Sequence, residues 1–393
     1  MAKYLEEFNP PKRLLLGPGP SNVNPRVLQA MSAPLLGHLD PAFLDIMDDV
    51  RDMLRVVFKT KNEITIPISG TGSAGMETAI VNVIEPGDTM VVGINGYFGN
   101  RIAEIGERAG ATVARVNAEW GLPLDPDQLN EELKKHKRVK AVAMVHAETS
   151  TGVRSPAKEI TTLSHEHDAL VIIDTVTSLG GVDVAMDDWD ADVSYSGTQK
   201  CLGCPPGLSP VTFGHRAEKV IFNRKTPVQS WYLDTSLLKN YWSENRAYHH
   251  TAPISMVYGL REGLRVVLEE GLENRFSRHE YNSAALRKGI EAMGMEMFAQ
   301  EDSRLPTLNT VRIPDGIDDA KVRRSLLTEH NIEIGGGLGP VVGKIWRIGL
   351  MGENSNKEAV VSALSALEAV LNEQGAKVTP GAGVSAAEAF YSS

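Results

Sequence analysis

A lysine and an aspartate stand where the surrounding sequence predicts burial. Asp174 ends the apolar run ALVIIDT (169–175), and Lys200 follows the small and polar residues of SYSGTQK (194–200). A carboxylate buried without a partner is strongly disfavoured, so Asp174 is expected to require a cation. Both residues follow predicted strands, whose carboxyl ends form the ligand-binding edge of an open α/β sheet. We therefore expect both side chains to face one crevice. The simplest alternative is that they only pair with each other or with solvent and bind no ligand.

The glycine-rich segment SGTGSAG (69–75) lies between a predicted strand and a predicted helix. Glycines allow a tight turn with free N–H groups, and a helix N-terminus adds partial positive charge, so this segment predicts a phosphate site. It also matches the dinucleotide-binding pattern GxGxxG, which makes an NAD-dependent dehydrogenase an alternative. That alternative requires a carboxylate after the next strand, but TMVVGI (89–94) is followed by Asn95 and Gly96.

These features together fit pyridoxal 5'-phosphate. This cofactor requires a lysine for a Schiff base, a carboxylate that keeps its ring nitrogen protonated, and an anion site for its phosphate. Partial burial and a nearby pyridinium would both lower the pKa of Lys200. The segment CLGC (201–204) contains both cysteines of the chain and suggests an alternative, a redox or binding module. No second cysteine pair is present to complete a four-ligand metal site.

Composition limits the possible partners. The chain has 393 residues, which is long enough for two domains that share one large core, and its 42% hydrophobic and 23% charged residues are an ordinary globular composition. The 40 basic and 50 acidic side chains give a net charge of −10, which argues against nucleic acid as a partner. The N-terminal residues show no signal-peptide pattern and no apolar stretch is long enough to cross a bilayer, so we expect a cytoplasmic protein without a membrane partner.

Helical and strand patterns alternate over about the first 215 residues. Short apolar runs separated by amphipathic segments predict a mostly parallel sheet with helices on both faces, a three-layer α/β/α domain. The predicted strands are 63–69, 89–94, 112–116, 141–147, 169–175 and 192–197, and the predicted helices are 43–58, 73–84, 100–110, 126–137 and 158–167.

A different pattern begins near residue 255. Two long helical segments lead into strands and helices that predict a smaller α+β domain. We expect an N-terminal arm over 1–20, a large domain over 21–270, a small C-terminal domain over 271–378 and a tail over 379–393 that is mobile at its end.

The chain resembles the alanine/serine–glyoxylate aminotransferases, which belong to the class V group of fold-type-I pyridoxal phosphate enzymes. The resemblance covers about nine tenths of the chain. It rests on LLLGPGPSNV, ISGTGSAGMETAIVNVIEPGD, HAETSTGV, VIIDTVTSLGGV, SYSGTQKCLGCPPGLSPVTF, YHHTAPISMVYGLREGL and GKIWRIGLMG.

The resemblance implies roles for individual residues. Lys200 would form the Schiff base and move the proton between the substrate Cα and the cofactor, and Asp174 would pair with the pyridinium nitrogen. Phe98 would stack on the ring, at a position where many relatives have Trp, and Arg347 would bind the substrate carboxylate. The remaining implied contacts are Thr71, Gly72, Ser73 and Gln199 with the phosphate, Thr149 near the cofactor 3'-oxygen and the substrate, Val176 beneath the ring, and Tyr248 and Thr251 with the phosphate of the other subunit in a homodimer.

The implied reaction is ping-pong transamination from a small amino acid, alanine or serine, to glyoxylate. The GPGPSN, GHLDPAF and YHHTAP segments would form the donor pocket. A ureidoglycine–glyoxylate aminotransferase is an alternative, although that branch has Gln where this chain has His38. A cysteine desulfurase or lyase is another, but a desulfurase would have His in place of Phe98 and a nucleophilic cysteine on a distant loop.

Overall fold

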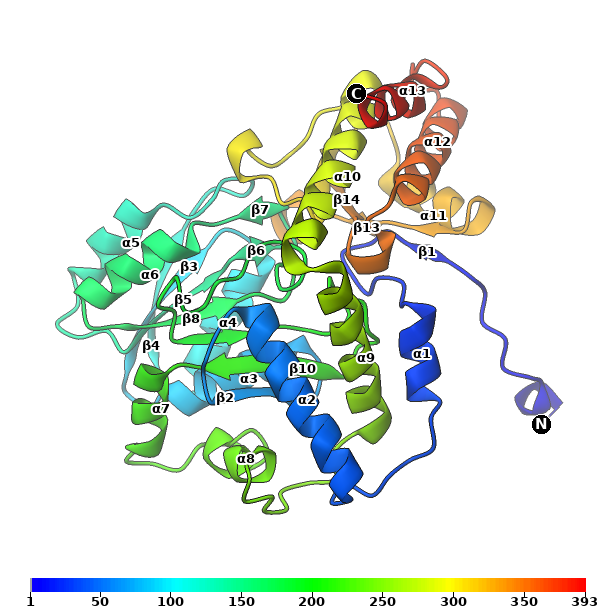
Figure 1. Cartoon of the computed structure of the whole chain (residues 1–393). Helices are drawn as coiled ribbons and strands as arrows, with labels where there is room; N and C mark the ends of the chain where they lie inside the picture. The colour runs from blue at the N-terminus through cyan, green and yellow to red at the C-terminus, as the bar shows by residue number, and fades with distance from the viewer. Residues whose placement is uncertain (1) are drawn as a thin grey trace.

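The apolar runs between residues 63 and 197 form the centre of one seven-stranded sheet, which is the main element of the computed structural model (Figure 1). The structure describes residues 2–393. The strand order is β2-β10-β9-β8-β5-β3-β4, and all strands are parallel except β10. Their bounds are β2 Ile64–Ser69, β3 Thr89–Ile94, β4 Thr112–Asn117, β5 Ala141–Val145, β8 Leu170–Asp174, β9 Val193–Tyr195 and β10 Leu208–Phe213.

The register of the central strands places Asp174 at the functional edge of the sheet. Asp174 is the last residue of β8 and lies opposite Val145 at the end of β5 and Tyr195 at the end of β9. Strands β5 and β8 are buried along their whole length, as expected for parallel strands covered on both faces. The covering helices are α2 Pro41–Phe58, α3 Gly72–Val83, α4 Tyr97–Arg108, α5 Pro126–Leu133, α6 Ala157–Glu166, α7 His215–Phe222 and α9 Ile254–Glu270.

Strand β10 was not among the predicted strands. Its sequence LSPVTF contains Pro210, and proline within a central strand normally argues against that assignment because it cannot donate a ladder hydrogen bond. Pro210 lies directly opposite Pro67 of β2. Its carbonyl still accepts a hydrogen bond from Ser196 N at 2.7 Å, so β10 keeps the contact with the segment that leads to Lys200.

A second unit packs above the sheet in Figure 1. Its antiparallel sheet has the order β11-β14-β13, and β1 pairs in parallel with β12. The bounds are β1 Leu14–Leu15, β11 Leu308–Arg312, β12 Ile332–Glu333, β13 Gly335–Gly336 and β14 Ile345–Gly349, with helices α10 Leu272–Ala292, α11 Asp319–Glu329 and α12 Lys357–Glu373.

The hydrophobic side chains form two main cores. One extends from Val27 to Val267, and the other combines Leu16 with residues between 285 and 387. The predicted domain boundaries at 20, 270 and 378 stay a prediction. The remaining short elements are α1 Pro25–Met31, α8 Thr235–Trp242 and the hairpin of β6 Ala147–Glu148 with β7 Val153–Arg154.

The C-terminal tail, which we expected to be mobile at its end, is helical over most of its length. The helix, α13 (Ala382–Tyr391), packs on α10 and α12. The buried carboxylate of Glu368 accepts hydrogen bonds from Gly381 N at 2.9 Å and Gly383 N at 2.6 Å, and so caps the start of α13. The Tyr391 hydroxyl donates to Asn282 at 2.7 Å, which fixes the other end.

In residues 2–393, every helix falls short of the length and apolar character that a membrane crossing requires. The same residues contain no cluster of three or more His, Cys, Asp or Glu side chains able to hold a metal ion.

Candidate active site

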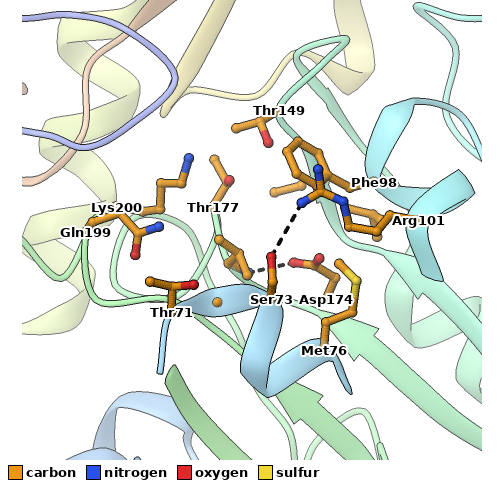
Figure 2. Close-up of a pocket in the computed structure, with 14 residues that line it drawn as sticks. Thr71, Ser73, Met76, Phe98, Arg101, Thr149, Asp174, Thr177, Gln199 and Lys200 are labelled. Atoms are coloured by element: carbon orange, nitrogen blue, oxygen red, sulfur yellow. Dashed lines mark hydrogen bonds between the residues drawn. The ribbon is translucent and has the colours of Figure 1, made fainter. Parts of the chain in front are cut away.

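A cavity of about 150 Å³ opens at the carboxyl ends of the central strands (Figure 2). All of the predicted site residues line it except Arg347, Tyr248 and Thr251. In this view Lys200 and Phe98 lie on opposite sides of the cavity, and Ser73 and Asp174 lie below them. The lining comprises Thr71, Gly72, Ser73, Met76, Phe98, Arg101, Val145, Ala147, Thr149, Asp174, Val176, Thr177, Gln199 and Lys200.

Lys200 is held in the loop that follows β9. Its side chain is only 8% exposed, and Nζ donates a hydrogen bond to the carbonyl of Pro18. The neighbouring Gly19 must lack a side chain, because a Cβ there would lie 2.5 Å from Lys200 Cδ. Burial, assisted by the positive charge of Arg347, lowers the pKa of Lys200 to about 8. At neutral pH a useful fraction of this amine is therefore unprotonated.

Asp174 is a buried acid with neutral hydrogen-bond donors. Its carboxylate accepts from Val176 N and from the Tyr195 hydroxyl, both at 2.8 Å. Burial raises its pKa to about 7 against the opposing effect of these two bonds, and the negative charge of Glu148 adds to the increase. A cationic ring nitrogen in the cavity would favour the ionised carboxylate, as the sequence predicted.

The start of α3 offers an anion site. Thr71 is the N-cap residue, yet its side chain makes no capping hydrogen bond to the first helical N–H groups. Gly72 is buried and Ser73 is exposed at the cavity. Uncapped N–H groups and the helix dipole favour a phosphate there. The third glycine of GTGSAG, Gly75, has a packing role instead, because a Cβ would lie 1.9 Å from Ser209 Oγ of β10.

Two further polar atoms favour a bound group. Thr177 Oγ1 and Gln199 Oε1 are buried, and neither has a hydrogen-bond partner among the described residues. Buried polar atoms are normally satisfied, so these two mark places where a ligand can supply the missing bond. Together with the uncapped α3 terminus, the buried acid and the buried lysine, they fit pyridoxal phosphate.

Phe98 and Arg101 form the wall opposite Lys200 (Figure 2). Both belong to the first turns of α4, and the Arg101 guanidinium lies 5.1 Å from the Phe98 ring centroid. Arg101 also donates to Ser73 Oγ at 3.4 Å, which joins this wall to the anion site. Sequence reasoning missed Arg101, although its spacing of three residues from Phe98 places both on one helix face.

Arg347 reaches the site from β14. It is 7% exposed and donates to the Gly336 carbonyl at 2.7 Å and to the Thr149 carbonyl at 3.3 Å. Burial lowers its pKa to about 10, which still leaves it charged at neutral pH. It does not line the cavity itself, but its bond to Thr149 connects it to a residue that does.

Tyr248 and Thr251 lie away from the cavity. Tyr248 is 61% exposed, and its ring centroid lies 5.2 Å from that of His38. Thr251 is also exposed. Their predicted role at the other subunit's phosphate stays a prediction.

The two cysteines are unsuited to thiolate chemistry at neutral pH. Both are fully buried, and burial raises the pKa of Cys201 to about 11 and that of Cys204 to about 12. Each thiol faces a backbone carbonyl, Cys201 that of Thr177 at 3.4 Å and Cys204 that of Gly259 at 3.6 Å. These environments argue against the redox module and against Cys201 as a desulfurase nucleophile.

Comparison with known proteins agrees with this geometry. The profile of the family Aminotransferase class-V matches residues 13–359. The (S)-ureidoglycine–glyoxylate transaminase of Bacillus subtilis is 45% identical, with 98% of this chain and 97% of the relative covered. The alanine–glyoxylate aminotransferase of Drosophila melanogaster is 43% identical, with 92% of each chain covered.

Solved structures show the same similarity. The crystal structure of ureidoglycine–glyoxylate aminotransferase from Bacillus subtilis has a TM-score of 0.97 and 46% identity, with 99% of this chain and all of that chain covered. That of alanine–glyoxylate aminotransferase from Nostoc sp. has a TM-score of 0.92 and 50% identity, with 93% and 97% covered. A cysteine desulfurase from Thermococcus onnurineus, at 14% identity and a TM-score of 0.73, shares the fold alone. The chain therefore belongs to the class V aminotransferases and is a pyridoxal phosphate-dependent transaminase of fold type I.

Proposed function

We propose that this transaminase moves the amino group of alanine or serine to glyoxylate in two half-reactions that share one site. The observation that carries the proposal is the convergence of Lys200, Asp174 and the uncapped start of α3 on one cavity, with Arg347 next to it. Glyoxylate is the proposed acceptor because both relatives described above are glyoxylate transaminases by name.

The residues divide the chemistry between them. Pyridoxal phosphate, when bound, supplies a sink for the electrons of the broken Cα–H bond. Asp174 would hold the ring nitrogen in its protonated form, and the N–H groups at Gly72 and Ser73 would hold the phosphate. The Lys200 amine, with its pKa lowered to about 8, is suited to take the proton from the substrate Cα and return it.

Arg347 is the proposed clamp for the substrate carboxylate. A guanidinium can donate two parallel charge-assisted hydrogen bonds to a carboxylate, and few side chains can replace this geometry. Its buried position on β14, with one bond to Gly336, fixes the stem while other N–H groups stay available. Thr149, whose carbonyl Arg347 contacts, would lie between the substrate and the cofactor.

Ureidoglycine is the second candidate donor. The relative named for it matches 98% of this chain, which is more than the 92% matched by the Drosophila alanine–glyoxylate enzyme. Against it stands His38, whose ring packs beside Tyr248 where the ureidoglycine branch would have Gln. This difference at position 38 is the reason why alanine and serine are placed before ureidoglycine as donors.

We further propose a homodimer in which Tyr248 and Thr251 complete the partner's phosphate site. Support comes from exposed aromatic side chains near Tyr248: Trp231 is 61% exposed, Tyr232 is 40% exposed, and Trp231 stacks on His249 with ring centroids 4.2 Å apart. Exposed aromatics gathered on one surface are typical of protein interfaces.

The first prediction concerns the Lys200 amine. Because its pKa is lowered to about 8, the initial rate at which cofactor-free protein captures pyridoxal phosphate should rise about tenfold between about pH 7 and about pH 9 and then level off. Borohydride trapping followed by mass spectrometry of the labelled peptide measures this rate. Lys200→Arg is the control and should carry no label at position 200. A rate that continues to rise towards pH 10.5, the ordinary lysine value, would contradict the assignment.

The second prediction identifies the donor. The loaded enzyme is mixed with alanine, serine or ureidoglycine in the absence of an acceptor, and the loss of the cofactor's visible absorbance is followed by stopped flow. We expect alanine or serine to react fastest. Arg347→Ala should raise the donor concentration that gives the half-maximal rate about tenfold to hundredfold, since a hydrogen bond to a charged group contributes about 1.5–3 kcal/mol.

Cofactor affinity should change less than about twofold in Arg347→Ala, because Arg347 is assigned to substrate and not to cofactor. Arg312→Ala, at the exposed end of the neighbouring strand β11, is the control for loss of an arginine outside the site and should behave as the unaltered enzyme. Fastest reaction with ureidoglycine would favour the second candidate, and no reaction with any amino acid would contradict the proposed function.

The third prediction tests the shared site. Lys200→Ala chains and Tyr248→Ala chains are each expected to have little activity. When they are unfolded together and refolded, a mixed dimer contains one site with both native residues, so about a quarter of the native activity should return. Activity that stays at the level of the separate variants would contradict the placement of Tyr248 in the partner's site.

A further inference from the structure

Glu148 is a buried carboxylate to which the mechanism above gives no role. It lies in β6, directly after the strand end that carries the site, and its side chain has no exposed surface. Burial raises its pKa. Glu148 accepts hydrogen bonds from Ser150 Oγ at 2.7 Å, Ser150 N at 3.0 Å, Phe98 N at 3.1 Å and Gly99 N at 3.3 Å. Two of these donors are backbone groups at the start of α4.

Helix α4 does not cap its own N-terminus. Its N-cap residue is Gly96, which offers no side chain, and a Cβ there would lie 2.3 Å from Glu148 Cγ and 2.4 Å from Ser150 Oγ. The first N–H of the helix, at Tyr97, donates to Ser150 Oγ at 2.8 Å. The first three N–H groups of α4 are therefore all satisfied by two side chains from the segment that also carries Thr149. A carboxylate at this position is also favoured by the helix dipole.

Phe98 is the second residue of α4 and forms the cavity wall opposite Lys200 (Figure 2). Its backbone N–H is bonded directly to Glu148, so the position of the ring depends on where the carboxylate holds the first turn. The negative charge of Glu148 also reaches Arg347, whose protonated form it favours. The same buried group thus contacts the first turn of α4 and influences the charge of Arg347 beside the cavity.

We propose that Glu148 is a positioning residue, which fixes the first turn of α4 and so places the Phe98 ring against the bound cofactor. This inference rests on the proposed function and on the stacking of Phe98 on the cofactor ring that the family resemblance implies. Glu148 lies outside the cavity lining, so its contact with the cofactor site runs through the backbone of Phe98, while its charge acts separately on Asp174 and Arg347.

A double-mutant cycle tests this coupling without measuring turnover. The dissociation constant of pyridoxamine 5'-phosphate, which binds without a bond to Lys200, is measured by equilibrium dialysis for the unaltered protein, Glu148→Gln, Phe98→Ala and the double variant. We expect Glu148→Gln to weaken binding about tenfold in the unaltered background and less than about twofold in the Phe98→Ala background.

Glu368→Gln is the matched control. Glu368 is also a buried carboxylate that caps a helix, α13, through two backbone N–H groups, but it lies in the second core. It should lower the melting temperature and leave pyridoxamine phosphate affinity unchanged. If Glu148→Gln does not fold, Ser150→Ala is the second variant, because it keeps the carboxylate and removes the hydrogen bond to Tyr97 N. We expect Ser150→Ala to weaken binding about threefold, and to have a smaller effect in the Phe98→Ala background.

The possible results distinguish failure of the positioning role of Glu148 from failure of the proposed function. Equal losses in both backgrounds, or no loss on Glu148→Gln or Ser150→Ala, would overturn the positioning role while the proposed function stands. Failure of the unaltered protein to bind pyridoxamine phosphate would overturn the proposed function and this inference with it.

Discussion

The burial of one carboxylate is the constraint on which the site depends. Asp174 ends a strand that is buried throughout, and its two hydrogen bonds come from neutral donors, an amide and a phenol. Such a group resists ionisation, which is why its pKa rises to about 7. A cation placed beside it favours ionisation, and by linkage the ionised acid binds that cation more tightly. A protonated pyridine ring would supply such a charge, and in this buried surrounding its attraction to the ionised Asp174 would be weakly screened by water.

The rest of the structure brings distant segments to this acid. Parallel strands β5, β8 and β9 end at one edge, which places Val145, Asp174 and Tyr195 side by side. The loop after β9 returns Lys200 to that edge, where the carbonyl of Pro18 holds its amine. Arg347 approaches from the other sheet and is joined to the site through the Thr149 carbonyl. Lys200 and Arg347 are thus bonded to backbone carbonyls of other segments, and Asp174 is bonded to its own loop and to the Tyr195 hydroxyl of the next strand. The proposed role of Glu148 adds a similar support for α4.

The sequence predicted the parts of this molecule that depend on local pattern. Apolar runs with intervening helices indicated the parallel sheet, and β3 has the predicted bounds of 89–94. Lys200, Asp174 and the glycine segment were found because their residue types are costly or unusual at strand ends. Features that depend on contacts between distant segments were harder to predict. Strand β10 was missed because it contains Pro210, and helix α13 was missed because its sequence is rich in small residues. Glu148 was missed because only the structure shows which N–H groups it caps. The one feature of the sequence that could have drawn attention to Glu148 is its position as a charged residue directly after a buried strand.

The protonation of the cofactor's ring nitrogen measures most directly whether Asp174 acts on the cofactor as a charged partner. The protein is loaded with pyridoxal phosphate labelled with ¹⁵N in the ring, and the nitrogen chemical shift is recorded at neutral pH in the native enzyme and in Asp174→Asn. We predict a protonated nitrogen in the native enzyme and an unprotonated one in the variant, whose side chain carries no charge. An unprotonated nitrogen in the native enzyme, or the same shift in both proteins, would contradict this prediction.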